Sequence, residues 1–169
     1  MEGITSTSAP IIAELTKTIN GYEGYHTPKN RDKTDEKFRE FLSSKLDSIA
    51  ERLTRIEEQY QSSGKNHKEF LHQAIASLKT IIYSLKNPCY CNHAFFSQPV
   101  LSSEKIAQLY DYDFQIKEQI EILDEESNQL ILDNNDTELN DMLNHFYDVI
   151  DGVNQSLTER EFVIMGDGE

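Results

Sequence analysis

Residues 41–60 read FLSSKLDSIAERLTRIEEQY, and the spacing of their apolar side chains indicates the fold class. Six apolar residues of this stretch are Leu42, Leu46, Ile49, Leu53, Ile56 and Tyr60. They recur at steps of 4, 3, 4, 3 and 4, which places them in one stripe along an α-helix. A heptad stripe of this kind packs against another helix in a nearly parallel or antiparallel direction.

Helical periodicity recurs along the chain, and no segment has the alternating pattern of a strand. We predict helices at about 9–20, 28–62, 67–86, 103–131 and 136–163, with an apolar loop at 87–101. Pro10 and Pro28 stand at predicted helix starts, and Pro88 follows a predicted helix end. The sequence therefore predicts an all-α fold, an antiparallel up-and-down four-helix bundle with an additional short N-terminal helix.

Length and composition favour a small soluble protein. The chain of 169 residues has the length of a single domain, which we expect to span residues 1–169. Its first residues lack the basic and apolar segments of a secretory signal, and no apolar run approaches the roughly 20 residues of a membrane span. Two cysteines are too few for a disulfide framework. We expect a cytoplasmic protein with no membrane span.

The net charge of −14 is unevenly distributed along the chain. Residues 1–88 have 13 basic and 12 acidic side chains, a net of +1, whereas residues 89–169 have 3 basic and 18 acidic side chains, a net of −15. The acidic half repels nucleic-acid phosphates, so we expect no nucleic-acid binding. The acidity is consistent either with a basic protein partner or with a solvated surface that keeps the protein soluble.

The stretch NPCYCNHAFF, residues 87–96, most resembles a chemical site. Cys89, Cys91 and His93 offer three of the four ligands that zinc needs, but at unusually tight spacing. A disulfide between residues i and i+2 is strained, and no third group orients a catalytic pair. We therefore expect a connecting loop with no catalytic residue, no cofactor and no metal. A metal or small ligand near Cys89, Cys91 and His93 remains the alternative.

Charged residues continue the apolar stripes of two predicted helices. Arg31, Asp35 and Arg39 follow one another at intervals of four, and Asp113 occupies a stripe position of the fourth helix. Arg39 and Asp113 each lie about 15 Å from the same end of the predicted bundle, given a rise of about 1.5 Å per residue. We predict a contact between Asp113 and Arg39 or Arg31. This polar cluster is either a structural ion pair or an anion-binding site.

Scattered residues suggest a relationship to a known family. They are Gly24-Tyr25, Arg31, Asp35, Arg39 and Leu42, the run from Ile82 through Phe96, Lys105-Ile106, Leu109-Tyr110, Asp113, and Arg160-Glu161. The chain thereby resembles a family of uncharacterised prokaryotic helical-bundle proteins with no established function. The resemblance implies a helical bundle and no activity. The family pattern favours small residues and glycine where this chain has Cys89 and Cys91, which weakens the metal hypothesis.

Aromatic residues gather at the end of the predicted bundle that carries the polar cluster. We interpret Tyr90, Phe95, Phe96 and Tyr110 as a candidate interaction surface. Together with the heptad stripes and the acidic half, they favour a non-enzymatic adaptor or scaffold. Its partner is an unknown protein, with a basic one favoured, or a second copy of the chain.

Overall fold

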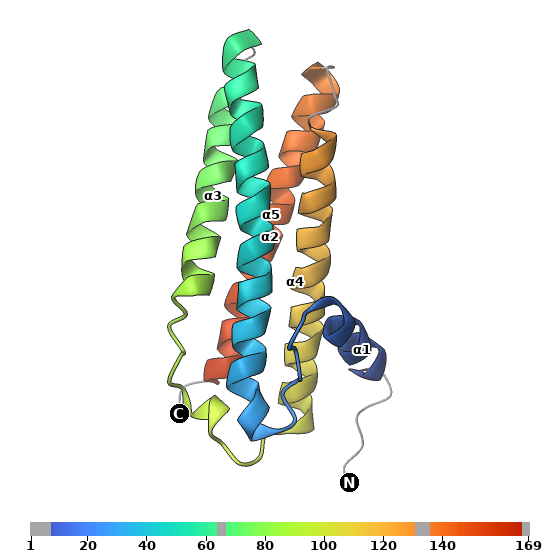
Figure 1. Ribbon diagram of the computed structural model, residues 1–169, viewed down its shortest axis with the longest axis vertical. Coiled ribbons are helices and arrows are strands. Elements are labelled where there is room, and N and C mark those ends of the chain that lie inside the picture. The colour runs from blue at the N-terminus through green and yellow to red at the C-terminus, as the bar shows by residue number, and fades with distance from the viewer. Residues whose placement is uncertain (1–7, 64–66, 131–135, 167–169) are drawn as a thin grey trace. The chain divides into compact units, whose positions relative to one another are not determined.

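The computed structural model describes residues 8–63, 67–130 and 136–166, and in this part of the chain it contains helices and no strands (Figure 1). The helices are α1 (Ser8–Thr18), α2 (Pro28–Ser63), α3 (Lys68–Lys86), α4 (Ser103–Gln129) and α5 (Asp136–Met165), with a short 3-10 helix, η1 (Ala94–Phe96), in the loop before α4. The all-α prediction is confirmed. None of the described helices is long and apolar enough to cross a membrane.

The helix boundaries follow from local chemistry. Pro28 begins α2 because its fixed φ suits the first helical turn. The α5 helix ends at Met165, and Gly166 follows with φ +74°, the left-handed conformation in which glycine commonly terminates helices. Residue 131, the predicted end of α4, lies outside the described residues, as does the side chain of Tyr60.

The chain divides into two compact units. One, here called the network unit, contains residues up to Phe41, Pro88–Lys117 and the chain from Gln155 onward; the other, the apolar unit, contains Leu42–Asn87 and Glu118–Asn154. Helices α2, α4 and α5 contribute residues to both units. The single domain remains a prediction from the sequence.

The apolar unit is built from the heptad stripes. Leu42, Leu46, Ile49, Leu53 and Ile56 are each 3% exposed or less. The side chains that α3, α4 and α5 bury in this unit include Leu71, Leu78, Ile120, Leu123, Leu143, Phe146 and Ile150. Ser127, a polar residue in the α4 stripe, is buried and accepts a hydrogen bond from Arg52, which also donates to Asp124. The stripe read from residues 41–60 therefore lines a core, as its spacing predicts.

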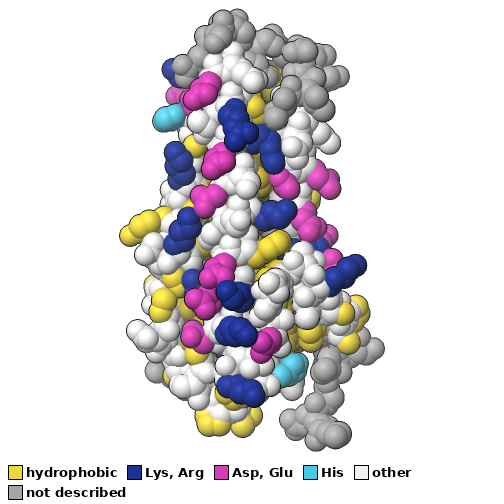
Figure 2. Space-filling view, in the orientation of Figure 1, with side chains coloured by type: hydrophobic (Ala, Val, Ile, Leu, Met, Phe, Trp, Pro, Cys, Tyr) yellow, Lys and Arg dark blue, Asp and Glu magenta, His cyan; other side chains and the backbone are white. Residues whose placement is uncertain are grey.

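The surface around α2 carries charges of both signs. Lys, Arg, Asp and Glu side chains are interspersed on the face seen in Figure 2. This mixture agrees with the net charge of +1 for residues 1–88, which include α2. Interspersed charges of both signs produce no strong field of one sign.

The core of the network unit is rich in aromatic side chains. Tyr22 and Tyr25, from the turn after α1, are 2% and 0% exposed. Gly24, between them, has φ +84°, and a side chain there would collide with the hydroxyl of Tyr110 on α4. That hydroxyl accepts a hydrogen bond from the Tyr25 amide at 2.9 Å. The turn therefore requires glycine at position 24 for both backbone conformation and space.

We predict that Gly24→Ala destabilises the protein more than Gly21→Ala. Gly21 has φ +85°, so alanine incurs a similar left-handed penalty of about 1–2 kcal/mol at either position. Only at Gly24 must the buried Tyr110 hydroxyl move, which adds about 1–3 kcal/mol for the broken hydrogen bond. Urea unfolding followed by circular dichroism measures both variants. Equal losses in the two variants would contradict the close contact.

Candidate functional site

The network unit encloses two carboxylates that meet at one guanidinium. Arg160 on α5 donates from Nε to Asp113 Oδ1 on α4 at 2.6 Å. Its Nη2 forms an ion pair with Asp35 Oδ1 on α2 at 2.9 Å. The three side chains are each 1% exposed or less. Because the planar guanidinium has five donors in fixed directions, one arginine can serve both carboxylates.

Three tyrosine hydroxyls complete this network. Tyr22 and Tyr25 both donate to Asp113 Oδ2, at 2.6 and 2.7 Å, and Tyr90 donates to Asp35 Oδ1 at 3.1 Å. Arg160 in turn donates to the hydroxyls of Tyr25 and Tyr90, at 2.8 and 3.0 Å. The ring of Phe38 lies 4.8 Å from the Arg160 guanidinium and provides a cation–π contact. The network thus joins α2, α4, α5 and two connecting segments.

The electrostatics of the network keep the tyrosines protonated. Burial raises the pKa of Tyr22, Tyr25 and Tyr90 above the ordinary value for tyrosine. Arg160 opposes this rise at Tyr25 and Tyr90, and the nearby carboxylates add to it. Burial acts to lower the pKa of Arg160, but Asp113 and its other partners raise it well above its usual range. Burial also raises the pKa of Asp113, against the opposing influence of Arg160. The tyrosines therefore remain hydrogen-bond donors and Arg160 remains charged.

The residues of the predicted polar cluster lie in the same unit, but their ion pairs differ from those predicted. The contact predicted between Asp113 and Arg39 or Arg31 is wrong, because the basic partner of Asp113 is Arg160. Arg39 donates to Asp35 Oδ2 at 2.8 Å, one turn away on its own helix. Arg160 reaches between the two carboxylates from α5, a placement that depends on how each helix is rotated about its axis.

Arg31 has a different role in the same unit. It is 1% exposed and donates to three backbone carbonyl oxygens, those of Tyr25, Phe95 and Gln98, at 2.8, 3.2 and 2.6 Å. Its guanidinium also lies 5.8 Å from the centre of the Phe95 ring. Arg31 therefore fastens the turn after α1 and the loop before α4 to the start of α2.

The predicted aromatic interaction surface is wrong for most of its members. Tyr90, Phe95 and Tyr110 are 4%, 1% and 1% exposed. Phe96 is half-buried and stacks on Tyr90. These aromatics cover the charged network, and the hydroxyls of Tyr90 and Tyr110 are engaged in it or in the turn. They belong to the core because the buried charges need apolar surroundings and hydrogen-bond partners.

In the loop that carries the two cysteines, the buried side chain of Tyr90 anchors the chain, and the thiols on either side of it in the sequence are exposed. Cys89 and Cys91 are free, and the Cys91 thiol donates to the Pro88 carbonyl at 3.2 Å. Nδ1 of His93 accepts a hydrogen bond from the Phe95 amide at 3.2 Å. Across residues 8–63, 67–130 and 136–166, no three His, Cys, Asp or Glu side chains are grouped so that they could hold a metal ion.

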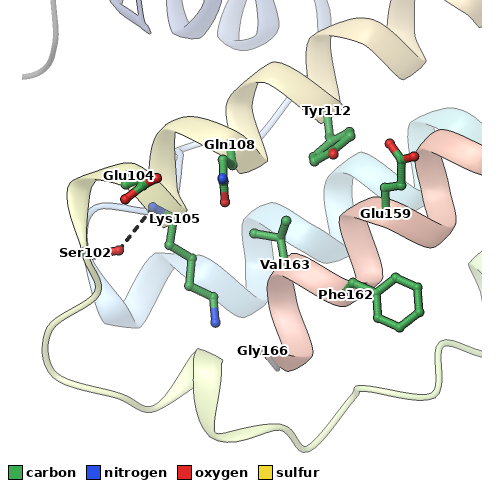
Figure 3. A pocket seen from close by; sticks show the side chains of 9 residues that line it. All are labelled: Ser102, Glu104, Lys105, Gln108, Tyr112, Glu159, Phe162, Val163 and Gly166. Atoms are coloured by element: carbon green, nitrogen blue, oxygen red, sulfur yellow. Dashed lines mark hydrogen bonds between the residues drawn. The ribbon is translucent and has the colours of Figure 1, made fainter. Parts of the chain in front are cut away.

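A groove of about 400 Å³ lies in the network unit between the start of α4 and the end of α5. Its lining includes Lys105, Gln108 and Tyr112 from α4 and Glu159, Phe162 and Val163 from α5 (Figure 3). In Figure 3 the Tyr112 ring and the Glu159 carboxylate face one another across it. Phe162, which also lines the groove, is 61% exposed.

Sequence reasoning named Arg160 but did not pair it with the carboxylates, and it missed Phe162, although each residue had a signal. The α5 stripe steps from Leu157 by three to Arg160 and by four to Ile164, so Arg160 is a charged residue in a core position. Phe162 follows Gln155 by seven residues on the opposite, solvent-facing side of the helix. An arginine in a core stripe indicates a buried pair, and a phenylalanine in a solvent stripe indicates an exposed apolar side chain.

Comparison with models of known protein families, with curated proteins and with solved structures finds no match to this chain. The functional interpretation therefore depends on the geometry of these residues.

We predict that Arg160→Met destabilises the protein by about 3–5 kcal/mol, because it leaves Asp35 and Asp113 buried without a cation that bridges them. Arg55→Met is the matched control: Arg55 is 74% exposed and pairs with Glu51 on the surface, so we expect a change below about 0.5 kcal/mol. Chemical denaturation measures both. Similar losses in the two variants would show that the network is not a major support of the fold.

We further predict that Cys89→Ser with Cys91→Ser changes the unfolding free energy by less than about 0.5 kcal/mol, because both thiols are exposed. Thermal denaturation with and without added zinc chloride measures this, and we expect similar melting temperatures for the wild-type protein and the double variant in both conditions. A zinc-dependent rise in melting temperature that the double variant loses would instead support the metal alternative.

Proposed function

We propose that the protein is a non-enzymatic interaction module, in which an antiparallel four-helix bundle presents the α4/α5 groove to a partner protein. The groove supplies the docking surface, and the buried network supplies the rigid support beneath it. In this proposal the side chains of the network are structural, because its carboxylates, hydroxyls and Arg160 guanidinium satisfy one another inside the core.

The antiparallel arrangement is supported by contacts between α4 and α5 within each unit. In the network unit, Lys105 donates to the Ile164 carbonyl, and the Tyr112 ring faces the Glu159 carboxylate (Figure 3). In the apolar unit, Gln119 lies against Gly152, and Glu126 contacts His145. In both units the later α4 residue pairs with the earlier α5 residue. Opposed numbering of this kind is typical of antiparallel helix pairs.

The observation that carries the proposal is the exposure of Phe162 beside the groove. Leaving most of this side chain in water forgoes part of the roughly 1.5–3 kcal/mol that full burial of a phenylalanine contributes. Aromatic residues beside concave surfaces are frequent energetic centres of protein interfaces. Val163 and the Tyr112 ring extend the apolar contact within the groove.

Affinity capture from a lysate of the source organism tests the proposal. We expect a partner that the wild-type protein retains and Phe162→Ser loses. Tyr83→Ser is the matched control, because Tyr83 is a 70% exposed aromatic on α3 in the apolar unit. Circular dichroism verifies that both variants fold. Identical retention of the partner by Phe162→Ser would contradict docking at the groove.

A further inference from the structure

We infer that the groove binds a basic peptide segment of another protein, one that places an apolar side chain about one helical turn from a lysine or arginine. This inference rests on the proposed function and specifies the chemistry of its partner.

Charge complementarity is the first argument. Glu104 and Glu159 line the groove. Asp111, three residues after the lining residue Gln108 on α4, is also exposed. Glu159 accepts a hydrogen bond from Gln155, which leaves the negative charge of its carboxylate unneutralised. A cationic side chain in the groove would therefore gain both attraction and charge-assisted hydrogen bonds.

The basic residues of the same helical segments are engaged by the protein itself. Arg160 is held in the network, and Lys117 is 5% exposed and pairs with Glu14 at 3.3 Å. Lys105 reaches the Ile164 carbonyl at 3.5 Å and lies 5.6 Å from the centre of the Phe95 ring. Arg160 and Lys117 are therefore withdrawn into the protein, whereas Lys105 lines the groove with its ammonium near the Ile164 carbonyl. The two carboxylates of Glu104 and Glu159 outnumber this one cation, so the field at the groove is negative.

The spacing of the lining residues defines the second requirement. Glu159 precedes Phe162 by three residues and Val163 by four, so a carboxylate and an apolar patch are neighbours along α5. A peptide that contacts both must carry its cation and its apolar side chain about as far apart as Glu159 and Phe162 are on α5, which is about one helical turn. A groove of about 400 Å³ lies at the lower end of the range for ligand sites and suits a few side chains.

A second copy of the chain is a less suitable occupant. Residues 89–169, which supply both walls of the groove, have a net charge of −15. Two such surfaces repel one another, and the same repulsion acts against nucleic-acid phosphates and anionic lipid headgroups.

Selection from a random peptide phage library on the purified full-length protein tests the inference. We expect enriched peptides with lysine or arginine about one turn from leucine or phenylalanine. Fluorescence anisotropy on synthetic copies should show binding weakened at least tenfold by Phe162→Ser. We expect Glu104→Gln with Glu159→Gln to weaken it several-fold, and higher sodium chloride to do the same.

The control variant Glu125→Gln with Asp148→Asn removes the same charge from exposed positions of the apolar unit and should leave binding unchanged. Enriched peptides that lack basic residues but require Phe162 would overturn the inference and leave the proposed function intact. Binding that does not require Phe162 would overturn both, and no enrichment at all would overturn the inference. A dimer seen by light scattering and dissociated by Phe162→Ser would assign the groove to a second copy and would also overturn the inference.

Discussion

The ion pairs of Arg160 with Asp35 and Asp113 are the constraint on which the network unit depends. Three charged groups are withdrawn from water, and each would be very costly if it were left alone. Arg39 adds a second cation at Asp35, so two arginines balance two carboxylates. Buried pairs of this kind often contribute little net stability compared with an apolar core, but they strongly penalise arrangements in which a partner is missing. We therefore interpret the network as a device that selects one rotation and one register for the helical segments that supply it.

Anchoring one side of α5 determines what its other side presents. Successive helical residues are about 100° apart, so Phe162 points about 200° away from Arg160. Once Arg160 is held by both carboxylates, Phe162 must face outward, beside the groove. A loss of the network would leave the Phe162 side chain chemically intact but free its helical segment to rotate. The position of Phe162 beside the groove therefore depends on the ion pairs of Arg160, two residues earlier on the same helix.

The sequence revealed the helices more fully than the site. Heptad spacing is a local property, so the stripe of Leu42, Leu46 and Ile49 could be read directly. It also showed that Asp35 and Asp113 lie in core positions, where a charge needs a partner. The identity of that partner depends on helix rotation and side-chain reach, which spacing alone does not specify. The aromatic residues of the loop were misinterpreted as an interaction surface because composition does not distinguish a phenylalanine that covers a buried charge from one that binds a partner protein.

The same network also bears on the acidity of the second half of the chain. Its three basic residues are Lys105, Lys117 and Arg160, and each is bound to other parts of the protein. Among the acidic residues of this half whose burial is described, only Asp113 is buried. Arg160 and Lys117 are buried and Lys105 is half-buried, while almost all of these carboxylates remain accessible, which makes the surface more acidic than composition indicates. A requirement for solubility would favour many acidic residues but would not require Arg160 and Lys117 to be buried. An acidic surface beside an exposed aromatic residue is the arrangement that a basic, apolar-anchored partner would need.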